Sequence, residues 1–596
     1  MLLYKMTLLN ICTKHKYFIL SVLLLFLLGI LIYTNCKYYN GFTVGGNISI
    51  SNSLELSNDC DCTDCSKPLE IITNIHKEIM KDSSNASQIF NKYFEDVEFY
   101  SSKFIHTEEG DPDMRDTIIK SFKGKEPKFI QAYIANIKYI IVKGYISPNI
   151  CIFSNLKDIQ FTNSTITKEN LCGLKKYPFV DDGEYRLYIQ NRANTMTIEK
   201  DAFSGFAIQD FCDDILLCAE FGIYFHNIPS LRRFNFDRYG LNGLPVNCGI
   251  ILEENYNLTT IERNTNYKLT AMNSILIQNN ASLTEIEQNA FNGLKALFFQ
   301  LIQNNSLTEI NENAFNRLNI EIVFEINNNL LLTTINGNAF KGLNMTSSYD
   351  SELRIYHNGN LAEINQDAFN EFKSGTAGMR SAPSRTDLKI SHNYKLILNN
   401  GAFNGINIRN ITLQHIKGIS ASGLMSGLFN ASSNVSSFSL SHAAHQVDPQ
   451  FVFDFGAFNG LTSINNIDIN NNLNLISILS DNFDQKSITN QITKLSITDN
   501  DSLNIIRLPP NLNIDTLEIT NNASLTDLDL TNVIINELTL DLNYLDLFCD
   551  YLKKYKENKE LIKINNILFV DEEGEKVEDF PSWDFGNFMS NYCGDD

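Results

Sequence analysis

The chain repeats a short pattern at a nearly constant interval. The segment LTEI at 283–286 returns at 307–310, and NAF at 289–291 returns at 313–315, so both shifts are 24 residues. A unit of this length cannot bury its own apolar side chains, whereas stacked units share one continuous core. The repeat therefore predicts a solenoid.

A fuller frame holds four positions, each three residues apart: an apolar residue, an asparagine and two more apolar residues. Alternate apolar residues before the asparagine, such as Phe299 and Leu301, predict a short strand with one face inward. We expect the asparagine to turn inward and bond to backbone groups at the bend. Asn304 should therefore be needed for stability, whereas Asn328, one position off the frame, should tolerate alanine. The frame occurs at Leu252/Asn255/Leu258/Ile261, Ile277/Asn280/Leu283/Ile286, Leu301/Asn304/Leu307/Ile310, Ile326/Asn329/Leu332/Ile335, Ile355/Asn358/Leu361/Ile364, Ile390/Asn393/Leu396, Ile469/Asn472/Leu475/Ile478, Ile497/Asn500/Leu503/Ile506 and Ile519/Asn522/Leu525/Leu528.

This frame resembles the leucine-rich repeat family, whose repeats are about 20–29 residues long. The half-repeat AFNGL at 290–294 resembles the extracellular animal-type class. The irregular repeat lengths and Ile-rich strands are similar to those of glycoprotein-hormone-receptor ectodomains. The resemblance covers about 131–530 and implies an α/β leucine-rich repeat solenoid, a curved horseshoe with a parallel sheet on its concave face.

Both ends of such an array need caps, because an open end exposes the core. Ile72, Ile75 and Ile79 recur at helical spacing, so residues 69–130 are predicted to form a helical N-terminal cap or a small separate module. Residues 531–596 resemble the C-terminal cap of extracellular arrays, with Tyr551 in place of the second cysteine of its usual Cys-x-Cys. That resemblance implies one disulfide, between Cys549 and Cys593.

An uncharged segment lies near the N-terminus. Residues 17–33 carry no charge, and their length is at the short end of what spans a bilayer. Lysines precede it at 5, 14 and 16, so the positive-inside rule predicts a cytosolic tail at 1–16, a transmembrane signal anchor at 17–33 and an extracellular remainder that begins with a stalk at 34–68. The chain is thus expected to be a single-pass type II cell-membrane protein. The alternative is a cleaved signal peptide and a secreted product.

Cysteine usage agrees with an oxidising exterior. Ten cysteines follow Cys36 and allow five disulfides, whose pairing the sequence leaves open. The cluster CDCTDC at 60–65 is interpreted as disulfide partners in preference to a metal site.

Charge and motifs exclude other classes. The net charge of -21 disfavours nucleic acid, because phosphate binding needs a basic surface. The sequence holds no G-x-S-x-G or H-E-x-x-H motif and no phosphate-binding glycine loop. We therefore predict a protein that is not an enzyme and has no cofactor.

Equivalent positions of successive predicted strands form columns that run along the array. One column that faces outward is rich in histidine. The residue two positions after the inward strand residue is His357, His392, His415 and His442 in four consecutive predicted turns. The inward asparagine follows His357 and His392, whereas the strands at 411–413 and 438–440 lack it. Because adjacent strands are about 4.8 Å apart, these imidazoles are expected to stack as a ladder. Arg354, Tyr356 and Lys389 stand in neighbouring columns and complete the candidate partner-binding residues.

Three interpretations of the histidine column are open. Histidine is tolerated as another polar residue in a hydrated column, or it forms a pH-responsive binding patch, because neighbouring charged imidazoles repel and titrate near neutrality. A metal site fits least, because a line of histidines is not a tetrahedron.

Sequons fall into two sets. Asn280, Asn304, Asn500 and Asn522 are inward residues of the frame and are not expected to carry sugar. The candidate glycosylation sites are Asn47, Asn85, Asn163, Asn257, Asn344, Asn410, Asn430 and Asn434.

Two functions fit this organisation. The first is a membrane-anchored receptor or adhesion ectodomain that binds an extracellular protein or glycan on its concave strands. The second is a structural cell-surface or matrix component without a specific ligand. A patch of mixed aromatic and charged residues on the strands favours binding, whereas a uniform Asn, Ser and Thr surface favours a coat.

Overall fold

The computed structural model describes most of the chain beyond residue 66. Residues 60–596 form one compact unit, and the predicted tail, anchor and stalk up to residue 66 lie outside the described residues. No helix in the described part is long and apolar enough to cross a membrane. The described residues are 67–594 without 96, 102–111, 164, 172–173, 175–184, 191–196, 204–220, 242–247, 266–269, 347–349, 376–385, 418–423, 426, 430–432, 444–449, 485, 489, 572 and 581–583.

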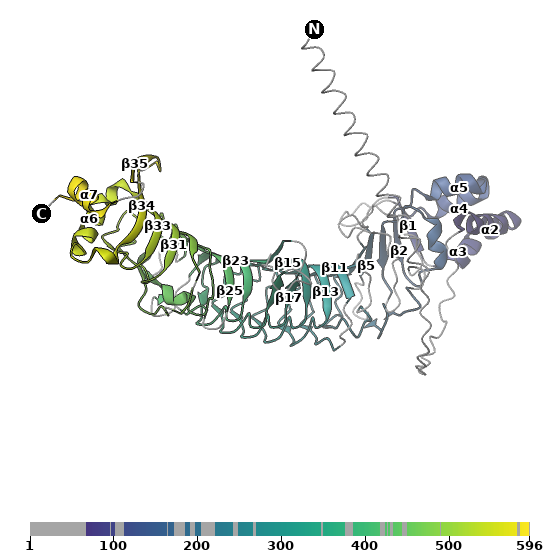
Figure 1. Ribbon diagram of the computed structural model, residues 1–596. Helices are drawn as coiled ribbons and strands as arrows, with labels where there is room; N and C mark the ends of the chain where they lie inside the picture. Colours follow the sequence, from purple (N-terminus) through teal and green to yellow (C-terminus); the bar gives the residue numbers. More distant parts are fainter. Residues whose placement is uncertain are drawn as a thin grey trace, which may run out of the picture. The chain divides into compact units, whose positions relative to one another are not determined.

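The chain winds as a parallel β-solenoid whose strands follow one another in sequence order (Figure 1). Neighbouring turns pair in register, so Phe299 lies beside Phe324 and Leu301 beside Ile326. These strands form most of a 21-stranded sheet. Its parallel members are β2 (Tyr139–Val142), β3 (Asp158–Phe161), β5 (Tyr185–Ile189), β7 (Phe221–His226), β9 (Cys248–Glu253), β11 (Thr270–Gln278), β13 (Leu294–Ile302), β15 (Asn319–Asn327), β18 (Ser351–Tyr356), β21 (Thr386–Asn393), β23 (Asn407–Ile416), β25 (Asn434–Ser441), β27 (Asn466–Asn470), β29 (Ile492–Thr498), β31 (Asn513–Thr520), β33 (Ile534–Asp541) and β34 (Lys563–Val570).

Shorter strands form further parallel sheets on another side of the coil. Several of them end on the last apolar residue of the frame, as at Ile286 and Ile310. They are β4 (Thr165–Ile166), β6 (Thr197–Ile198), β8 (Arg233–Phe234), β10 (Thr260–Ile261), β12 (Glu285–Ile286), β14 (Glu309–Ile310), β16 (Thr334–Ile335), β19 (Glu363–Ile364), β22 (Ile397–Leu398), β24 (Leu424–Met425), β26 (Phe451–Asp454), β28 (Leu475–Leu479), β30 (Ile505–Arg507) and β32 (Asp527–Asp529). Two more short strands, β17 (Asn344–Thr346) and β20 (Lys373–Gly375), extend the large sheet.

Antiparallel strands and helices cover both ends of the large sheet. β1 (Val97–Tyr100) pairs with β2, and β35 (Lys576–Phe580) pairs with β34, so neither end leaves a long parallel strand open to another chain. Among the described residues, four helices precede the solenoid: α2 (Pro68–Lys81), α3 (Ala86–Phe94), α4 (Arg115–Gly124) and α5 (Pro127–Ile134). Phe94 and Phe99 pack on Phe153 of the first turns at ring distances of 5.4 and 5.0 Å. These helices and the solenoid therefore share one core.

The repeat frame predicted from the sequence is confirmed by burial. Its asparagines and the strand residues before them have no exposed surface, for example Leu301, Asn304 and Leu307. The phenylalanines of the AF segments stack from turn to turn, with ring distances of 5.6 Å from Phe291 to Phe315 and 5.5 Å from Phe315 to Phe340. One apolar spine thus runs through the repeats.

The inward asparagines form a hydrogen-bonded ladder. The N–H of Asn280 donates to Oδ1 of Asn304 (3.2 Å), and its Nδ2 donates to the carbonyl of Leu252 (2.9 Å). At the far end the Tyr544 hydroxyl accepts from the N–H of Asn522 at 2.6 Å. The side chains satisfy backbone groups that have no strand partner at the bend, as the sequence predicted.

The structure is mostly sheet, which differs from the expected α/β composition. In the described part, α-helices lie only before residue 135 and after residue 544, where α6 (Leu545–Lys554) and α7 (Phe585–Phe588) belong to the C-terminal end. The AF segments instead form tight turns, as where the N–H of Leu294 donates to the carbonyl of Phe291 (3.1 Å). A repeat of 24 residues has little length left for a helix after two strands and their bends.

Candidate functional site

The outward-facing side chains of the large sheet, which we call the sheet face, are positioned by a backbone bend in each turn. The residue just before the inward asparagine has a positive φ, which is 55° at His357 and 54° at His392. This left-handed conformation directs the next side chain inward. The same bend occurs at Asn279, Gln303, Asn328, His357, His392, His415, His442, Asn471, Asp499 and Asn521, where φ runs from 50° to 57°.

This bend explains which residues occupy the column. Asn, Asp and His are enriched several-fold among non-glycine residues with positive φ. Histidine is therefore tolerated where asparagine stands in other turns. Spacing alone did not reveal this backbone constraint, although the recurrence of Asn, Asp and His at one position was a usable signal.

The four column histidines form a ladder of neighbouring rings, which we call the His ladder. Ring centroids lie 4.6 Å apart from His357 to His392, 4.5 Å from His392 to His415 and 4.6 Å from His415 to His442. His357 and His442 are exposed at the two ends, while His392 and His415 are half-buried. The ladder expected from strand spacing is present in the structure.

His392 has the most perturbed environment in the His ladder. Burial, followed by the nearby His357 and His442, lowers the pKa of His392 below its ordinary value. Its Nδ1 is buried and has no hydrogen-bond partner among the described residues. The inner imidazole therefore resists protonation unless an anion approaches it.

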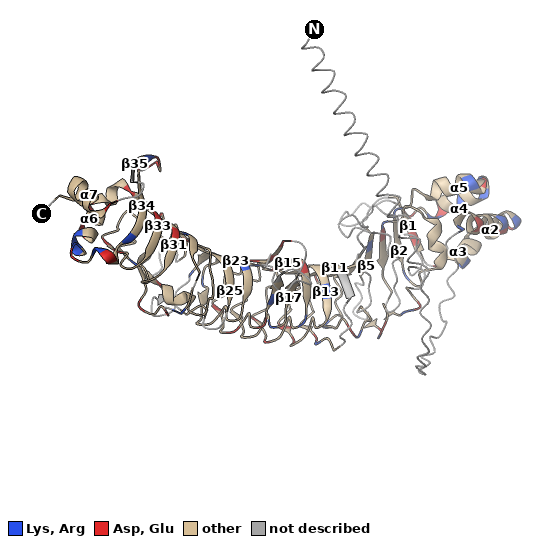
Figure 2. Cartoon of the chain, in the orientation of Figure 1, with Lys and Arg blue, Asp and Glu red and all other residues tan. Residues whose placement is uncertain are grey.

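The basic side chains beside the His ladder, Arg354 and Lys389, are compensated by one carboxylate. Lys389 Nζ lies 2.7 Å from Glu352, and Arg354 pairs with the same carboxylate. Burial opposes ionisation of Glu352, but hydrogen bonds from Lys389 and Arg354 leave its pKa below the ordinary value. Figure 2 shows the wider pattern, with basic and acidic residues scattered over a mostly uncharged solenoid.

Tyr356 belongs to a second network, which it forms with Glu325 and Asn327. Its hydroxyl donates to Oε1 of Glu325 at 2.5 Å and accepts from Nδ2 of Asn327 at 2.9 Å. Burial and the hydrogen bond to Glu325 raise the pKa of Tyr356 to about 12. Its ring meets that of His357 edge to face at 5.3 Å, so the network and the His ladder are continuous.

An aromatic section of the sheet face was not singled out from the sequence. Tyr188 on β5 stacks on Tyr224 on β7, with ring centroids 4.7 Å apart. Ile251 and Leu276 continue the same column on β9 and β11. The sequence could have predicted this section, because the residue between the two inward strand positions is apolar or aromatic in these four turns.

The described residues do not support a metal site. No group of three or more His, Cys, Asp or Glu side chains in the described part is arranged to hold a metal ion.

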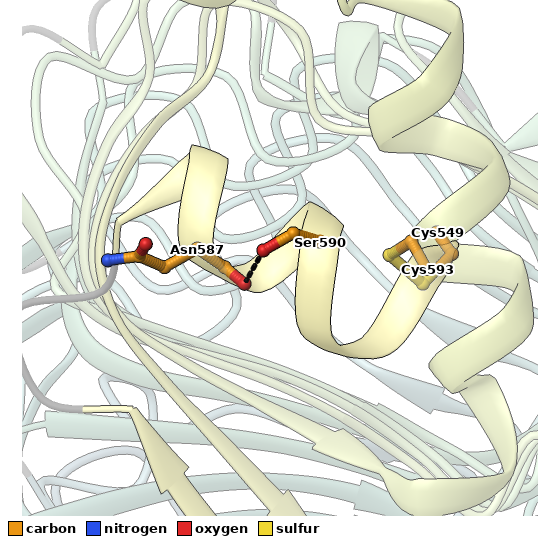
Figure 3. Close-up of a disulfide and its surroundings, with 4 residues drawn as sticks. All are labelled: Cys549, Asn587, Ser590 and Cys593. Atoms are coloured by element: carbon orange, nitrogen blue, oxygen red, sulfur yellow. Dashed lines mark hydrogen bonds between the residues drawn. A yellow bond between two sulfur atoms is a disulfide. The ribbon is translucent and has the colours of Figure 1, made fainter. Parts of the chain in front are cut away.

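The disulfide implied by the resemblance is formed. Cys549 on α6 is bonded to Cys593 on the turn η8 (Met589–Cys593). Figure 3 shows this bond beside the turn, where the Ser590 hydroxyl donates to the carbonyl of Asn587 at 3.1 Å. Tyr551, which replaces the second cysteine of the usual cap, is buried. The bond therefore joins α6 to the C-terminal turn.

The sequons divide as the frame predicted. Asn280, Asn304, Asn500 and Asn522 are fully buried and bonded within the asparagine ladder. Of the candidate glycosylation sites, the exposed ones are Asn85, Asn257 and Asn434, the half-buried ones are Asn163, Asn344 and Asn410, and Asn47 and Asn430 lie outside the described residues.

Comparison with known proteins adds no family assignment. No protein-family model matches the chain, and no curated protein matches its sequence.

Proposed function

We propose that the chain is an extracellular leucine-rich repeat protein that binds a protein or glycan partner through its sheet face, in the manner of receptor or adhesion ectodomains. In this proposal residues 17–33 anchor it in the cell membrane, the solenoid lies outside the cell, and no catalysis is involved. The family resemblance and the topology rest on sequence patterns, namely the asparagine frame and the lysines before residue 17.

One observation supports binding in particular: the sheet face carries a chemically mixed patch over consecutive turns. Glu352 and Arg354 on β18 form one ordered network with Lys389 on β21, and Tyr356 forms a second with Glu325 on β15. The His ladder continues this patch across β23 and β25. Interfaces favour aromatic residues and arginine held in place by their neighbours. A coat would need no such order.

The alternative is a structural surface component. It is favoured by the later turns, where the sheet face carries mostly small polar side chains such as Asn470, Thr498 and Thr520. A coat of this kind would have no preferred contact along the solenoid.

A matched pair of variants tests the proposal in intact cells. Thr412 is half-buried on β23 beside the His ladder, and Glu363 is exposed on β19, on another side of the coil. Thr412→Arg should reduce chemical cross-linking of the full chain to its partner about tenfold or more, because an inserted large charged side chain separates the surfaces. Glu363→Lys should leave cross-linking unchanged. Equal effects of both variants would contradict binding through the sheet face.

Protease treatment of intact cells tests the topology. An epitope at the C-terminus should be digested and one at the N-terminus protected. Protection of the C-terminal epitope would refute the orientation, and loss of the N-terminal epitope from the mature protein would show cleavage.

A further inference from the structure

Three of the four histidines in the His ladder lack a carboxylate partner among the described residues. No carboxylate of the described residues forms an ion pair with His357, His392 or His442. His226, on the same sheet face five turns earlier, shows the contrast. Its Nδ1 lies 3.5 Å from Glu253 and its Nε2 lies 3.8 Å from Glu254. His357, His392 and His442 therefore differ from a histidine whose charge the protein itself balances.

The carboxylates nearest to the His ladder are engaged elsewhere. Glu352 binds Arg354 and Lys389, and Glu325 accepts from Tyr356 and Asn327. The remaining three on adjoining strands are also engaged: Asp387 pairs with Arg409 at 2.8 Å, Asp468 accepts from Asn470 at 2.6 Å, and Glu321 pairs with Lys295 at 2.5 Å. Rotation of any of these toward an imidazolium would break an existing hydrogen bond or ion pair.

The other charged groups around the His ladder are cationic. Lys395 follows β21, and its Nζ donates to Oδ1 of Asn360 at 2.6 Å. Lys417 follows β23 directly after Ile416. Tyr356 and Tyr394 are the titratable neutral groups that meet the ladder, at ring distances of 5.3 Å from His357 and 6.1 Å from His392. A protonated ladder flanked by two lysines is a linear row of positive charge within a chain of net charge -21.

We propose that the His ladder with Lys395 and Lys417 binds an acidic polysaccharide, and that it binds more tightly at mildly acidic pH. Charged imidazoles about 4.5 Å apart repel one another, and an anion laid along the row offsets that repulsion. Binding must then draw protons onto the ladder, and protons must strengthen binding to the same extent, because the two processes are thermodynamically linked.

The surroundings favour a polysaccharide over an acidic peptide. The column next to the His ladder carries hydroxyl and amide groups, at Ser391, Gln414 and Ser441, which suit the many hydroxyls of a sugar. Tyr394 is 47% exposed and stands perpendicular to the His392 ring, so an exposed aromatic side chain, a type that packs against the apolar side of sugar rings, borders the ladder. The regular row of imidazoles also matches an extended polymer with one charge per unit.

This inference rests on the proposed function, because it assigns a ligand class to the same sheet face. The test measures binding of the full chain to polygalacturonate, with uncharged dextran and polyglutamate of similar length as comparisons. Polygalacturonate should bind on the order of tenfold more tightly at about pH 5.5 than at about pH 7.5. Dextran should not bind at either pH, and polyglutamate should bind more weakly than polygalacturonate.

The matched variants replace histidine by asparagine, which fits a positive φ. Changing His357, His392, His415 and His442 together should remove the pH dependence, while His226→Asn should retain it. Calorimetry in two buffers of different ionisation enthalpy should show proton uptake by the parent only when polygalacturonate binds.

Three results would overturn the inference: equal affinity at both pH values, an unchanged pH ratio in the quadruple variant, or tighter binding of polyglutamate. If any of these results occurs while Thr412→Arg still reduces partner cross-linking, the ligand class is wrong and the proposed function stands. Loss of that effect as well would refute both.

Discussion

The asparagine ladder should account for much of the stability of the solenoid, and Asn304→Ala tests this directly. The Asn304 side chain accepts from the N–H and Nδ2 of Asn280 (3.2 and 3.1 Å). It donates to the carbonyls of Ile277 (2.8 Å) and Ile302 (3.0 Å). Alanine removes all four contacts at a position with no exposed surface.

The expected magnitude follows from the groups that are left without partners. The N–H of Asn280 would remain buried and unpaired, which costs about 1–3 kcal/mol. The two carbonyls lose one donor each and add a smaller penalty, so we expect a total of roughly 2–4 kcal/mol.

The control variant at Asn328 must be compatible with the backbone conformation of that residue. The sequence predicted that Asn328→Ala would be neutral, but Asn328 has a φ of 55°, where alanine costs roughly 1–2 kcal/mol. That prediction was wrong about the backbone. Asn328→Gly is the proper control, because glycine adopts positive φ without steric cost and still removes the side chain.

Urea unfolding of the full chain, followed by far-UV circular dichroism, measures both variants. Hydrogen exchange adds a local reading, since the Asn280 amide should lose protection in Asn304→Ala alone. A loss below about 0.5 kcal/mol for Asn304→Ala, or equal losses in Asn304→Ala and Asn328→Gly, would refute the assigned role of the ladder.

Three further outcomes are expected. Tyr544→Phe should destabilise the chain by about 1–3 kcal/mol in urea unfolding, because the N–H of Asn522 loses its acceptor; an unchanged midpoint would show that water replaces the hydroxyl. Because the folded pKa of His392 lies below its unfolded value of about 6.5, stability should be lost as pH falls below about 6.5, and thermal unfolding of His392→Asn should show a smaller loss than the parent. Replacing Cys549 and Cys593 together by serine should lower stability by about 2–5 kcal/mol, and peptide mapping without reductant should recover these two cysteines linked in the parent.

The sequence was sufficient for features that repeat along the chain. The frame around Asn304 and the His ladder both follow from one period applied many times, because parallel strands in register bring equivalent residues side by side. A similar periodic reading would also have found the aromatic column of Tyr188 and Tyr224.

Contacts that a single pair of neighbouring residues makes could not be predicted from the repeat period. Glu352 compensates Arg354 on its own strand and Lys389 on the next, so the charge balance depends on which rotamers meet across the turn. The Tyr544 hydroxyl ends the asparagine ladder, but no second copy of that contact exists in the described repeats to mark it as a pattern. The low helix content was not predicted, because the expectation of an α/β fold came from the family resemblance and not from a pattern of residues.

Photo-cross-linking on intact cells tests the central claim, that the sheet face around the His ladder contacts a partner. A photoreactive amino acid is placed at Thr412 on β23 in one variant and at Glu363 on β19 in the other. The account predicts a discrete cross-linked species from position 412 and none from position 363. Cross-links from position 363 alone, or equal yields from both positions, would contradict it.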